Sequence, residues 1–342
     1  MAERTLSKRE LNRALLARQL LLERVSLPLP RALERLGGIQ NQYAPNAYIR
    51  LWSCLEGFRR DDLTRALGRR TAVQGTLMRE TIHVVSRPDY WALAVAIRAA
   101  QLEWFLRMRK QQPGRRQLQR KAAVLRAFLA DGPRTSAELV ANIGRDWGVG
   151  PTLDLVRVPP SGTWVKRRAD LYGLAETWVG HADIGEADAR DHLVRRYLAA
   201  FGPASRKDIG LWSHLSLADL DAVLTRLTLR RFRSEAGEEL IDIPRAPLPD
   251  PDTPVPVRFL PTWDAVLLVH ARRTGILPEE YRPRIFSTTM PQSIGTFLVD
   301  GRVAGTWTHV DGRIDWNPFA RLDRATAREV ADEADRLAAF YD

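Results

Sequence analysis

The spacing of hydrophobic residues changes from helical to alternating several times along the chain, and each change follows a group of helices. Leucines at helical spacing begin at Leu11, behind a capping box formed by Ser7 and Glu10. Three shorter helices and then two alternating segments follow, over residues 31–37, 46–56, 61–68, 73–76 and 81–85. Helices followed by a hairpin are the element order of a winged helix, so the first part of the chain predicts that structure.

The same order recurs later in the chain as a weak internal repeat with an offset of seventy residues. The matching positions are Val124 and Val194, Arg126 and Arg196, and Gly132-Pro133 and Gly202-Pro203. Each copy continues into a new helix and ends in an expected hairpin, with strands Trp164–Arg168 and Leu171–Leu174 in the first copy and Leu229–Arg233 and Glu239–Ile243 in the second. We therefore expect three winged-helix units in tandem.

A proline-rich linker and a small β-meander follow the third unit. Six prolines lie between residues 244 and 256, a composition that excludes helix and central strand. Asp300-Gly301 and Asp311-Gly312 then predict tight turns between alternating strands, and a final amphipathic helix is expected from Asp323 to Phe340. The predicted fold class is α+β, mainly α, with winged-helix units over 1–112, 113–185 and 186–245 and a C-terminal antiparallel β-domain over 246–342.

The composition excludes several classes of protein. A single cysteine, Cys54, permits neither an internal disulfide nor a cysteine-ligated zinc. The six histidines are scattered and no Gly-rich phosphate loop occurs, so we expect neither a metal nor another cofactor. No apolar segment is long enough to span a bilayer, and the first residues lack the apolar core of a signal peptide. We therefore expect a cytoplasmic protein without a membrane partner.

The net charge favours a polyanionic partner. Fifty-two basic residues against 41 acidic ones give a charge of +11, which makes nucleic acid the first candidate and an anionic membrane the second. The segment 98–126 contains nine basic residues and one acidic residue, and it is either a solvated helix face or a surface that follows phosphates. The expected hairpins of the second and third units carry more cations, at Lys166, Arg167, Arg168, Arg230, Arg231 and Arg233.

Two glutamines separated by one residue follow the second helix. Gly37 and Gly38 end that helix, and the chain then presents Gln40 and Gln42 before the next helix begins. Residues i and i+2 of an extended chain point the same way, so two amides can converge on one atom as donors and acceptors. On spacing alone, a polar loop that caps the neighbouring helix is the alternative.

Four segments resemble a family of tandem winged-helix DNA-binding proteins. They are Leu-Gly-Gly-Ile-Gln-x-Gln at 36–42, Thr-Leu-Met-Arg-Glu-Thr-Ile-His at 76–83, Arg-x-Pro-x-Ser-Gly-x-Trp at 157–164 and Val-Asp-Gly-Arg-Val-x-Gly-Thr-Trp at 299–307. Members of that family include bacterial alkylpurine DNA glycosylases that unhook interstrand crosslinks and protect producers of azinomycin-type genotoxins. The resemblance covers the chain from about residue 6 to residue 320.

The resemblance also implies roles for single residues. The Gln-x-Gln motif is catalytic in the characterised glycosylases, which implies that Gln40 and Gln42 are the catalytic residues here. The middle position is usually aromatic or aliphatic in the family but is Asn41 in this chain, so we expect the motif to be held differently. Contacts with the DNA backbone near the lesion are implied for the first wing, through Arg79, Thr81 and His83.

The chemistry of the leaving group explains how two amides can suffice. A purine alkylated at N7 or N3 is already cationic, so it departs as a neutral base without a general acid. The remaining tasks are to hold a water molecule and to stabilise positive charge on the sugar, for which oriented carbonyl dipoles are adequate. A crosslinked purine is tethered to the opposite strand and cannot enter a deep base-flipping pocket, which favours a surface that grips the backbone.

We therefore expect a monofunctional DNA glycosylase that acts on bulky cationic alkylpurine adducts in double-stranded DNA, with interstrand crosslinks as a further candidate substrate. No lysine lies near the motif in the sequence to form a Schiff base, since the neighbours along the chain are Lys8 and Lys110. We expect a monomer associated with the nucleoid. The alternative is a winged-helix protein that binds DNA without catalysis, as a regulator or as a shield for adducts.

Overall fold

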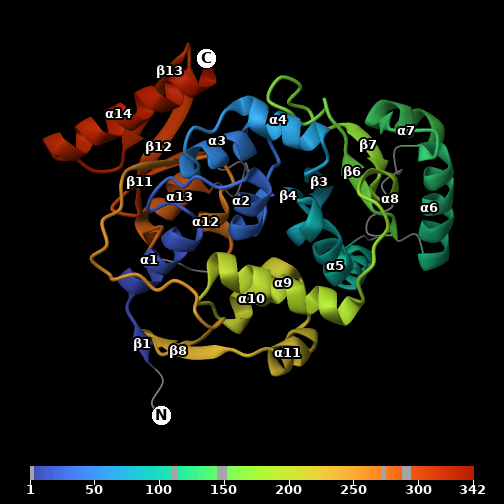
Figure 1. Ribbon diagram of the computed structural model, residues 1–342, viewed down its shortest axis with the longest axis horizontal. Coiled ribbons are helices and arrows are strands. Elements are labelled where there is room, and N and C mark those ends of the chain that lie inside the picture. The colour runs from blue at the N-terminus through green and yellow to red at the C-terminus, as the bar shows by residue number, and fades with distance from the viewer. Residues whose placement is uncertain (1–3, 109–113, 145–151, 271–274, 287–293) are drawn as a thin grey trace.

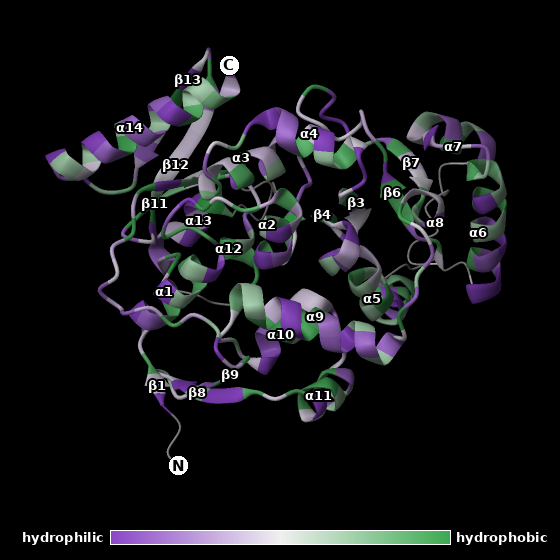
Figure 2. Cartoon of the chain, in the orientation of Figure 1, coloured by the Kyte–Doolittle hydropathy of each residue, from purple (hydrophilic) through white to green (hydrophobic). Residues whose placement is uncertain are grey.

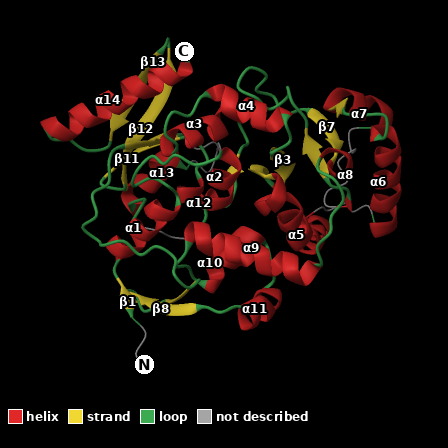
Figure 3. Cartoon of the chain, in the orientation of Figure 1, coloured by secondary structure: helices red, strands yellow, loops and turns green. Residues whose placement is uncertain are grey.

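The computed structural model describes residues 4–108, 114–144, 152–270, 275–286 and 294–342. Helices make up most of the regular structure, and the strands of the described residues gather in three separate antiparallel or mixed sheets (Figure 3). The predicted class, α+β and mainly α, is confirmed. Within the described ranges no helix is both long and apolar enough to cross a membrane.

The first unit has the order helix, strand, helix, helix, strand, strand. It follows β1 (Thr5–Leu6) and α1 (Lys8–Arg18), and the predicted capping box of Ser7 and Glu10 is present at the start of α1. The elements of the unit are α2 (Leu29–Leu36), β2 (Ile39–Gln40), α3 (Pro45–Cys54), α4 (Arg60–Gly68), β3 (Ala72–Thr76) and β4 (Ile82–Ser86). Strand β4 lies between β2 and β3, so the motif strand β2 is the edge of the first wing.

The second unit joins its strands to those of the first. It follows α5 (Arg87–Met108), which lies within the predicted limits 1–112 of the first unit. Its elements are α6 (Arg115–Leu129), β5 (Arg134–Thr135), α7 (Ser136–Ile143), β6 (Leu155–Arg157), β7 (Leu171–Leu174) and α8 (Ala175–Trp178). Strand β6 pairs with β3, which gives one six-stranded sheet of order β2-β4-β3-β6-β7-β5. The first two wings are therefore fused rather than independent.

The strand expected over 164–168 is wrong. Strand β7 pairs with β6, and residues 158–170 form a long connecting loop between them. Pro159 and Pro160 have no N–H to donate to a ladder. Ser161 turns the chain instead, because its Oγ donates to the carbonyl of Arg168 at 2.7 Å and accepts from the N–H of Asp170 at 2.7 Å.

The third unit repeats the second closely enough to support the seventy-residue offset. Its elements are α9 (Glu186–Phe201), α10 (Arg206–Ser213), α11 (Leu217–Arg226), β8 (Arg230–Ser234) and β9 (Glu239–Asp242). Thr135 and Ser205 occupy equivalent positions in the repeat, and each forms a capping box, with Glu138 and Asp208 respectively. Ser216 is the N-cap of α11, where its side chain accepts a hydrogen bond from the N–H of Asp219. Strand β1 adds to this wing in parallel with β8.

The C-terminal part is a four-stranded meander covered by a helix. Residues 243–257 contain no helix or strand, as the prolines predicted. The elements that follow are β10 (Arg258–Leu260), α12 (Ala265–Leu268), α13 (Arg282–Ile285), β11 (Gly295–Val299), β12 (Arg302–Val310), β13 (Arg313–Pro318) and α14 (Arg324–Tyr341). Both predicted Asp-Gly turns have positive φ at the two central residues, with 46° and 74° at Asp300 and Gly301, the conformation of a type I′ hairpin.

The buried core crosses the limits of these units. One cluster joins Leu15 of α1, Leu93 of α5, Tyr197 of α9 and Leu298 of β11, and Figure 2 shows amphipathic helices such as α9 and α14 with mixed hydrophobic and hydrophilic turns. Helices α5 and α9 pack against each other along their length. The domain boundaries at 112/113, 185/186 and 245/246 therefore stay a prediction from the sequence.

Candidate functional site

The two glycines before the motif are required by close packing. Gly37 has a φ of 70°, and a Cβ there would lie 3.0 Å from the Cβ of Ala200 on α9. Gly38 has a φ of 81°, and a Cβ there would lie 2.8 Å from Val85 Cγ1 on β4. Only glycine combines this conformation with this space. The turn thus places β2 directly against β4 and beside α9.

Gln40 is buried and its side-chain orientation is fixed by an arginine. It stands in register with His83 of β4 and is 6% exposed. Its Oε1 accepts a hydrogen bond from Nη2 of Arg79. A guanidinium group only donates, so the carbonyl end of the Gln40 amide must face Arg79. Within the described part of the chain, the Nε2 of Gln40 has no hydrogen-bond partner.

Gln42 is exposed, and its carbonyl oxygen faces the same segment. Oε1 accepts a hydrogen bond from the backbone N–H of Ile82 at 2.8 Å. Both motif amides therefore direct their oxygens toward residues 79–82. An amide oxygen has two lone pairs, so each glutamine keeps one acceptor position after making this bond. Two fixed carbonyls with a spare lone pair each can orient a water molecule.

Asn41 points into the protein and holds the motif by hydrogen bonds. It is 2% exposed, its Oδ1 accepts from the N–H of Ala47 at 3.1 Å, and its Nδ2 donates to Gln74 Oε1 at 3.1 Å. Gln74 donates in turn to the carbonyl of Gly162 at 3.1 Å. The amide of Asn41 thus holds the motif by hydrogen bonds to two neighbouring segments. It connects the motif to β3, to α3 and to the loop 158–170.

The first-wing residues expected to contact DNA have internal partners. Arg79 has a left-handed backbone, with a φ of 56°, and its Nη1 donates to the carbonyl of Leu268 at 3.1 Å. Burial lowers the pKa of Arg79. The half-buried Thr81 donates to the carbonyl of Met78 at 3.0 Å. These bonds connect Arg79 to Gln40 and to the protein interior, and its expected contact with the DNA backbone stays a prediction.

His83 is adjacent to the motif but is enclosed. It is 3% exposed, and its Nδ1 lies 3.0 Å from the carbonyl oxygen of Thr81. Burial lowers the pKa of His83 to about 3, so the ring is neutral near pH 7. The enclosed imidazole lies beside the motif, and its expected contact with DNA stays a prediction.

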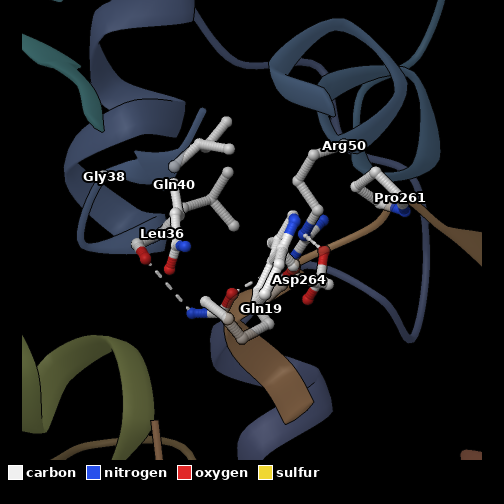
Figure 4. Close-up of a pocket in the computed structure, with 10 residues that line it drawn as sticks. Gln19, Leu36, Gly38, Gln40, Arg50, Pro261 and Asp264 are labelled. Atoms are coloured by element: carbon white, nitrogen blue, oxygen red, sulfur yellow. Dashed lines mark hydrogen bonds and ion pairs between the residues drawn. The ribbon is translucent and has the colours of Figure 1, made fainter. Parts of the chain in front are cut away.

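A narrow pocket lies beside Gln40 (Figure 4). Leu36 and Gln40 line one side, Arg50, Pro261 and Asp264 line the opposite side, and Gln19 lies below them. The free volume of the pocket is about 10 Å³, which is room for one water molecule. A purine base does not fit in this space. The site is therefore suited to hold a small reactant against a substrate that stays outside.

The side of the pocket opposite Gln40 contains a buried ion pair. Arg50 Nε lies 3.1 Å from Asp264 Oδ2, and both side chains are almost fully buried. Burial raises the pKa of Asp264, and the charge of Arg50 opposes that shift. Among the described residues, Arg50 Nη1 and Asn46 Nδ2 are buried donors without a partner. Unpartnered buried donors are rare, and two of them on one helix near Gln40 mark this region as one that accepts a polar ligand or water.

The loop 158–170 brings a second set of predicted residues to the motif. Lys166, Arg167 and Arg168 are all exposed. Arg167 Nη1 donates to the hydroxyl of Tyr43 at 2.6 Å, and Tyr43 directly follows Gln42. Lys166 therefore lies in a loop that contacts the motif, although it is far away in the sequence. The expectation that no lysine lies near the motif concerned neighbours in the sequence, and the loop adds a lysine from a distant segment.

The cations of the third wing lie elsewhere. Arg230, Arg231 and Arg233 are exposed on β8, the purple strand at the lower left of Figure 2. Figure 1 shows β8 on the far side of α9 and α10 from β3 and β4. The structure thus presents two separate sets of exposed cations, one at the loop 158–170 beside the motif and one on the third wing. One arginine of each set is paired with a carboxylate, Arg168 with Asp170 and Arg231 with Glu239.

Part of the basic segment 98–126 is neutralised by ion pairs. Arg98 lies 2.6 Å from Asp154, and Arg115 and Arg126 pair with Glu103 and Glu176. Arg109 and Lys110 lie outside the described residues. In the ranges that the structure describes, no group of three or more His, Cys, Asp or Glu side chains is arranged to hold a metal ion.

Sequence reasoning found the two glutamines but missed their supports. Arg50, Gln74 and Asp264 belong to no motif and are far apart in the sequence. Gln74 alone gave a local signal, since it is a polar residue at an inward position of a hydrophobic strand. The roles of Arg50 and Asp264 depend on the packing of α3 against the segment after β10, which spacing along the chain does not reveal.

Comparisons with known proteins agree with this arrangement. The model of the family described as DNA glycosylase AlkZ-like matches residues 33–340. The fold is similar to that of the Streptomyces sahachiroi DNA glycosylase AlkZ, with a TM-score of 0.81 and 19% sequence identity, over 98% of this chain and 97% of that one. No curated protein shows a significant match. Since the family match covers most of the chain, including the glutamine motif, the protein belongs to the AlkZ-like DNA glycosylase family.

Proposed function

We propose that this protein hydrolyses the N-glycosidic bond of bulky cationic alkylpurine adducts in double-stranded DNA, with Gln40 and Gln42 as the catalytic residues. The observation that carries the proposal is the orientation of the two amides. Their carbonyl oxygens are fixed by Arg79 and by the N–H of Ile82. Gln40 also lines a pocket with room for one water molecule, and the exposed Gln42 lies two residues farther along the same segment.

The proposed roles follow from what each group can do. The adduct leaves as a neutral base because alkylation has already given it a positive charge, so no general acid is needed. The spare lone pairs of Gln40 and Gln42 accept hydrogen bonds from the attacking water and stabilise positive charge as it grows on the sugar. As the water oxygen bonds to C1′ of the sugar, the proton that it loses passes to solvent. The small pocket suits a substrate that is not flipped into the protein, and interstrand crosslinks are substrates of this kind.

Binding to the DNA is proposed for both sets of exposed cations. Lys166, Arg167 and Arg168 would contact phosphates next to the lesion, and Arg230, Arg231 and Arg233 would contact phosphates farther along the duplex. We propose that the protein acts as a monomer in the cytoplasm, at the nucleoid. The monofunctional mode rests on the cationic leaving group alone, since Lys166 lies in a loop that contacts the motif.

A duplex that carries one N7-methylguanine tests the proposal. The protein is incubated with this duplex and with an undamaged duplex, and alkali then cleaves any abasic site. Strand cleavage that depends on both the adduct and the protein supports base release. A duplex with a nitrogen-mustard crosslink, analysed on a denaturing gel, tests the larger substrate.

Two controls separate the alternatives. Borohydride traps a covalent product if Lys166 or another amine forms a Schiff base, and a trapped complex would contradict the monofunctional mode. If neither damaged duplex releases a base although both bind, the protein is instead a DNA-binding member of the family without catalysis.

A further inference from the structure

The loop 158–170 carries an aliphatic side chain that folding leaves in solvent. Val165 is 93% exposed, more than any of the other exposed large hydrophobic residues in the described part of the chain. An isolated surface valine is ordinary. Val165 is different because it stands at the tip of a turn, where Lys166, Arg167 and Arg168 follow it directly and are also exposed.

The turn is held rigidly from behind. The N–H of Thr163 donates to the carbonyl of Lys166 at 3.1 Å and closes the tip around Val165. The N–H of Gly162 donates to the carbonyl of Arg168 at 3.1 Å and closes the base of the loop. Both bonds hold the backbone so that the valine projects outward.

The residue before the valine anchors the turn in the protein. Trp164 is 8% exposed, and its ring lies 5.6 Å from that of Tyr48 and 5.1 Å from that of Tyr341. Arg60, at the start of α4, stands over the same ring at 5.1 Å. Trp164 therefore anchors the turn from the inside, and Val165 next to it faces solvent.

The tip is also attached to the catalytic motif. Arg167 donates to the hydroxyl of Tyr43 at 2.6 Å, and Gln74 donates to the carbonyl of Gly162 at 3.1 Å. Gln74 is bonded to Asn41 within the motif. The valine tip and the two glutamines therefore keep a fixed spatial relation.

We propose that Val165 is a wedge, which inserts between two base pairs of the duplex and unstacks the step next to the adduct. Proteins that bend DNA insert apolar side chains in this way while neighbouring cations hold the phosphates. Unstacking is easiest where a base is damaged, so the wedge favours lesions over intact steps. This inference rests on the proposal that the motif acts on duplex DNA, and it adds how the sugar becomes accessible without a flipped base.

The test uses a duplex with 2-aminopurine next to a stable abasic analogue, so that no chemical step is needed. The fluorescence of 2-aminopurine rises when the base unstacks. We expect a rise with the wild-type protein and no rise with Val165→Ser at saturating protein, while Val165→Phe keeps the rise. Val124→Ser is the matched control, because Val124 on α6 is also exposed and belongs to no proposed contact; it should behave as wild type.

Affinity provides a second readout. Val165→Ser should weaken binding to the lesion duplex by about tenfold, since it removes the burial of two methyl groups. Its salt dependence should equal that of wild type, because no cation is changed. Equal fluorescence for wild type and Val165→Ser, or no rise with wild type, overturns the wedge.

The base-release assay is run on the same variants, so the two proposals can fail separately. If the fluorescence rises with wild type but not with Val165→Ser, and no base is released, the wedge is supported and the glycosylase proposal is rejected. If base is released but the fluorescence does not depend on Val165, the glycosylase proposal is supported and the wedge is rejected.

Discussion

Arg79 is the residue for which the structure and the family resemblance lead to different expectations. The resemblance implies a contact with the DNA backbone, whereas the structure bonds Arg79 to the carbonyl oxygens of Gln40 and Leu268. Replacement of Arg79 by Met removes the charge and both bonds while keeping most of the side-chain volume. Lys166→Met is the matched control, because Lys166 is an exposed cation beside the motif.

The two positions should differ in the salt dependence of DNA binding. A phosphate contact contributes about 0.9 to the slope of log affinity against log salt, which equals about 3.5-fold in affinity between 50 and 200 mM salt. We expect Lys166→Met to reduce the slope by about this amount and Arg79→Met to leave it unchanged. Fluorescence anisotropy with a labelled duplex at several salt concentrations measures both slopes.

The free energy of unfolding should respond in the opposite way, with a loss for Arg79→Met and none for Lys166→Met. Arg79→Met leaves two buried carbonyl oxygens without their donor, at about 1–3 kcal/mol each, and loss of a desolvated charge offsets part of this. We expect a net loss of about 2 kcal/mol in the free energy of unfolding, seen as a lower Tm. Lys166→Met should leave the Tm unchanged. If Arg79→Met reduces the salt slope as much as Lys166→Met does and keeps the wild-type Tm, the assignment of Arg79 to Gln40 is refuted.

Further predictions concern the supports of the motif. Asn41→Tyr should lower the free energy of unfolding by about 3 kcal/mol, because it overpacks a buried site and leaves Gln74 and the N–H of Ala47 without a partner. Chemical denaturation measures this change, and a variant as stable as wild type would contradict the prediction. The free energy of unfolding should fall by about 1.4 kcal/mol per pH unit as the pH drops below about 6.5. The cause is His83: its imidazole takes up a proton in the unfolded chain, whereas burial lowers its pKa to about 3 in the folded protein. The same scan with His83→Gln should lack that component, and an equal pH dependence would count against the burial. Asp242→Asn should lower the free energy of unfolding by about 3–5 kcal/mol, because Arg18 and Asp242 form a fully buried ion pair with two bonds of 2.7 Å. A loss below about 1 kcal/mol, which is typical of an exposed ion pair, would contradict this prediction.

Local rules predicted much of the fold. The capping box at Ser7, the Asp-Gly turns at Asp300 and Asp311 and the proline linker each depend on residues that are close together in the sequence. Such signals act over one turn of chain, and the structure shows them where they were expected.

The missed features depend on contacts between distant segments. The loop 158–170 was expected as a strand because Trp164–Arg168 precedes a clear strand, yet β7 pairs with residues 155–157. The position of Lys166 beside the motif follows from a hydrogen bond between residues 167 and 43. Sequence separation gives no measure of such proximity.

The same limit applies to the candidate site. The glutamine pair was visible because its two members are adjacent in the sequence, but the direction of the amides depends on Arg79, which comes from another segment. Burial of His83 likewise depends on its place in a strand between β2 and β3. The sequence therefore indicated which groups form the site, and only the packing shows how they are oriented.

Release of N7-methylguanine under single-turnover conditions tests the catalytic role of the two glutamines most directly. The rate is compared for wild type, Gln40→Ala, Gln42→Ala, the double variant and Gln117→Ala, an exposed glutamine on α6 that serves as control. Loss of one oriented dipole should reduce the rate by about 10²–10³-fold, with the double variant little slower than the single ones if both amides hold one water. DNA affinity should stay near that of wild type, and Gln117→Ala should release base at the wild-type rate. Wild-type rates in Gln40→Ala and Gln42→Ala, or no release by any of these proteins, would contradict the assignment of catalysis to this motif.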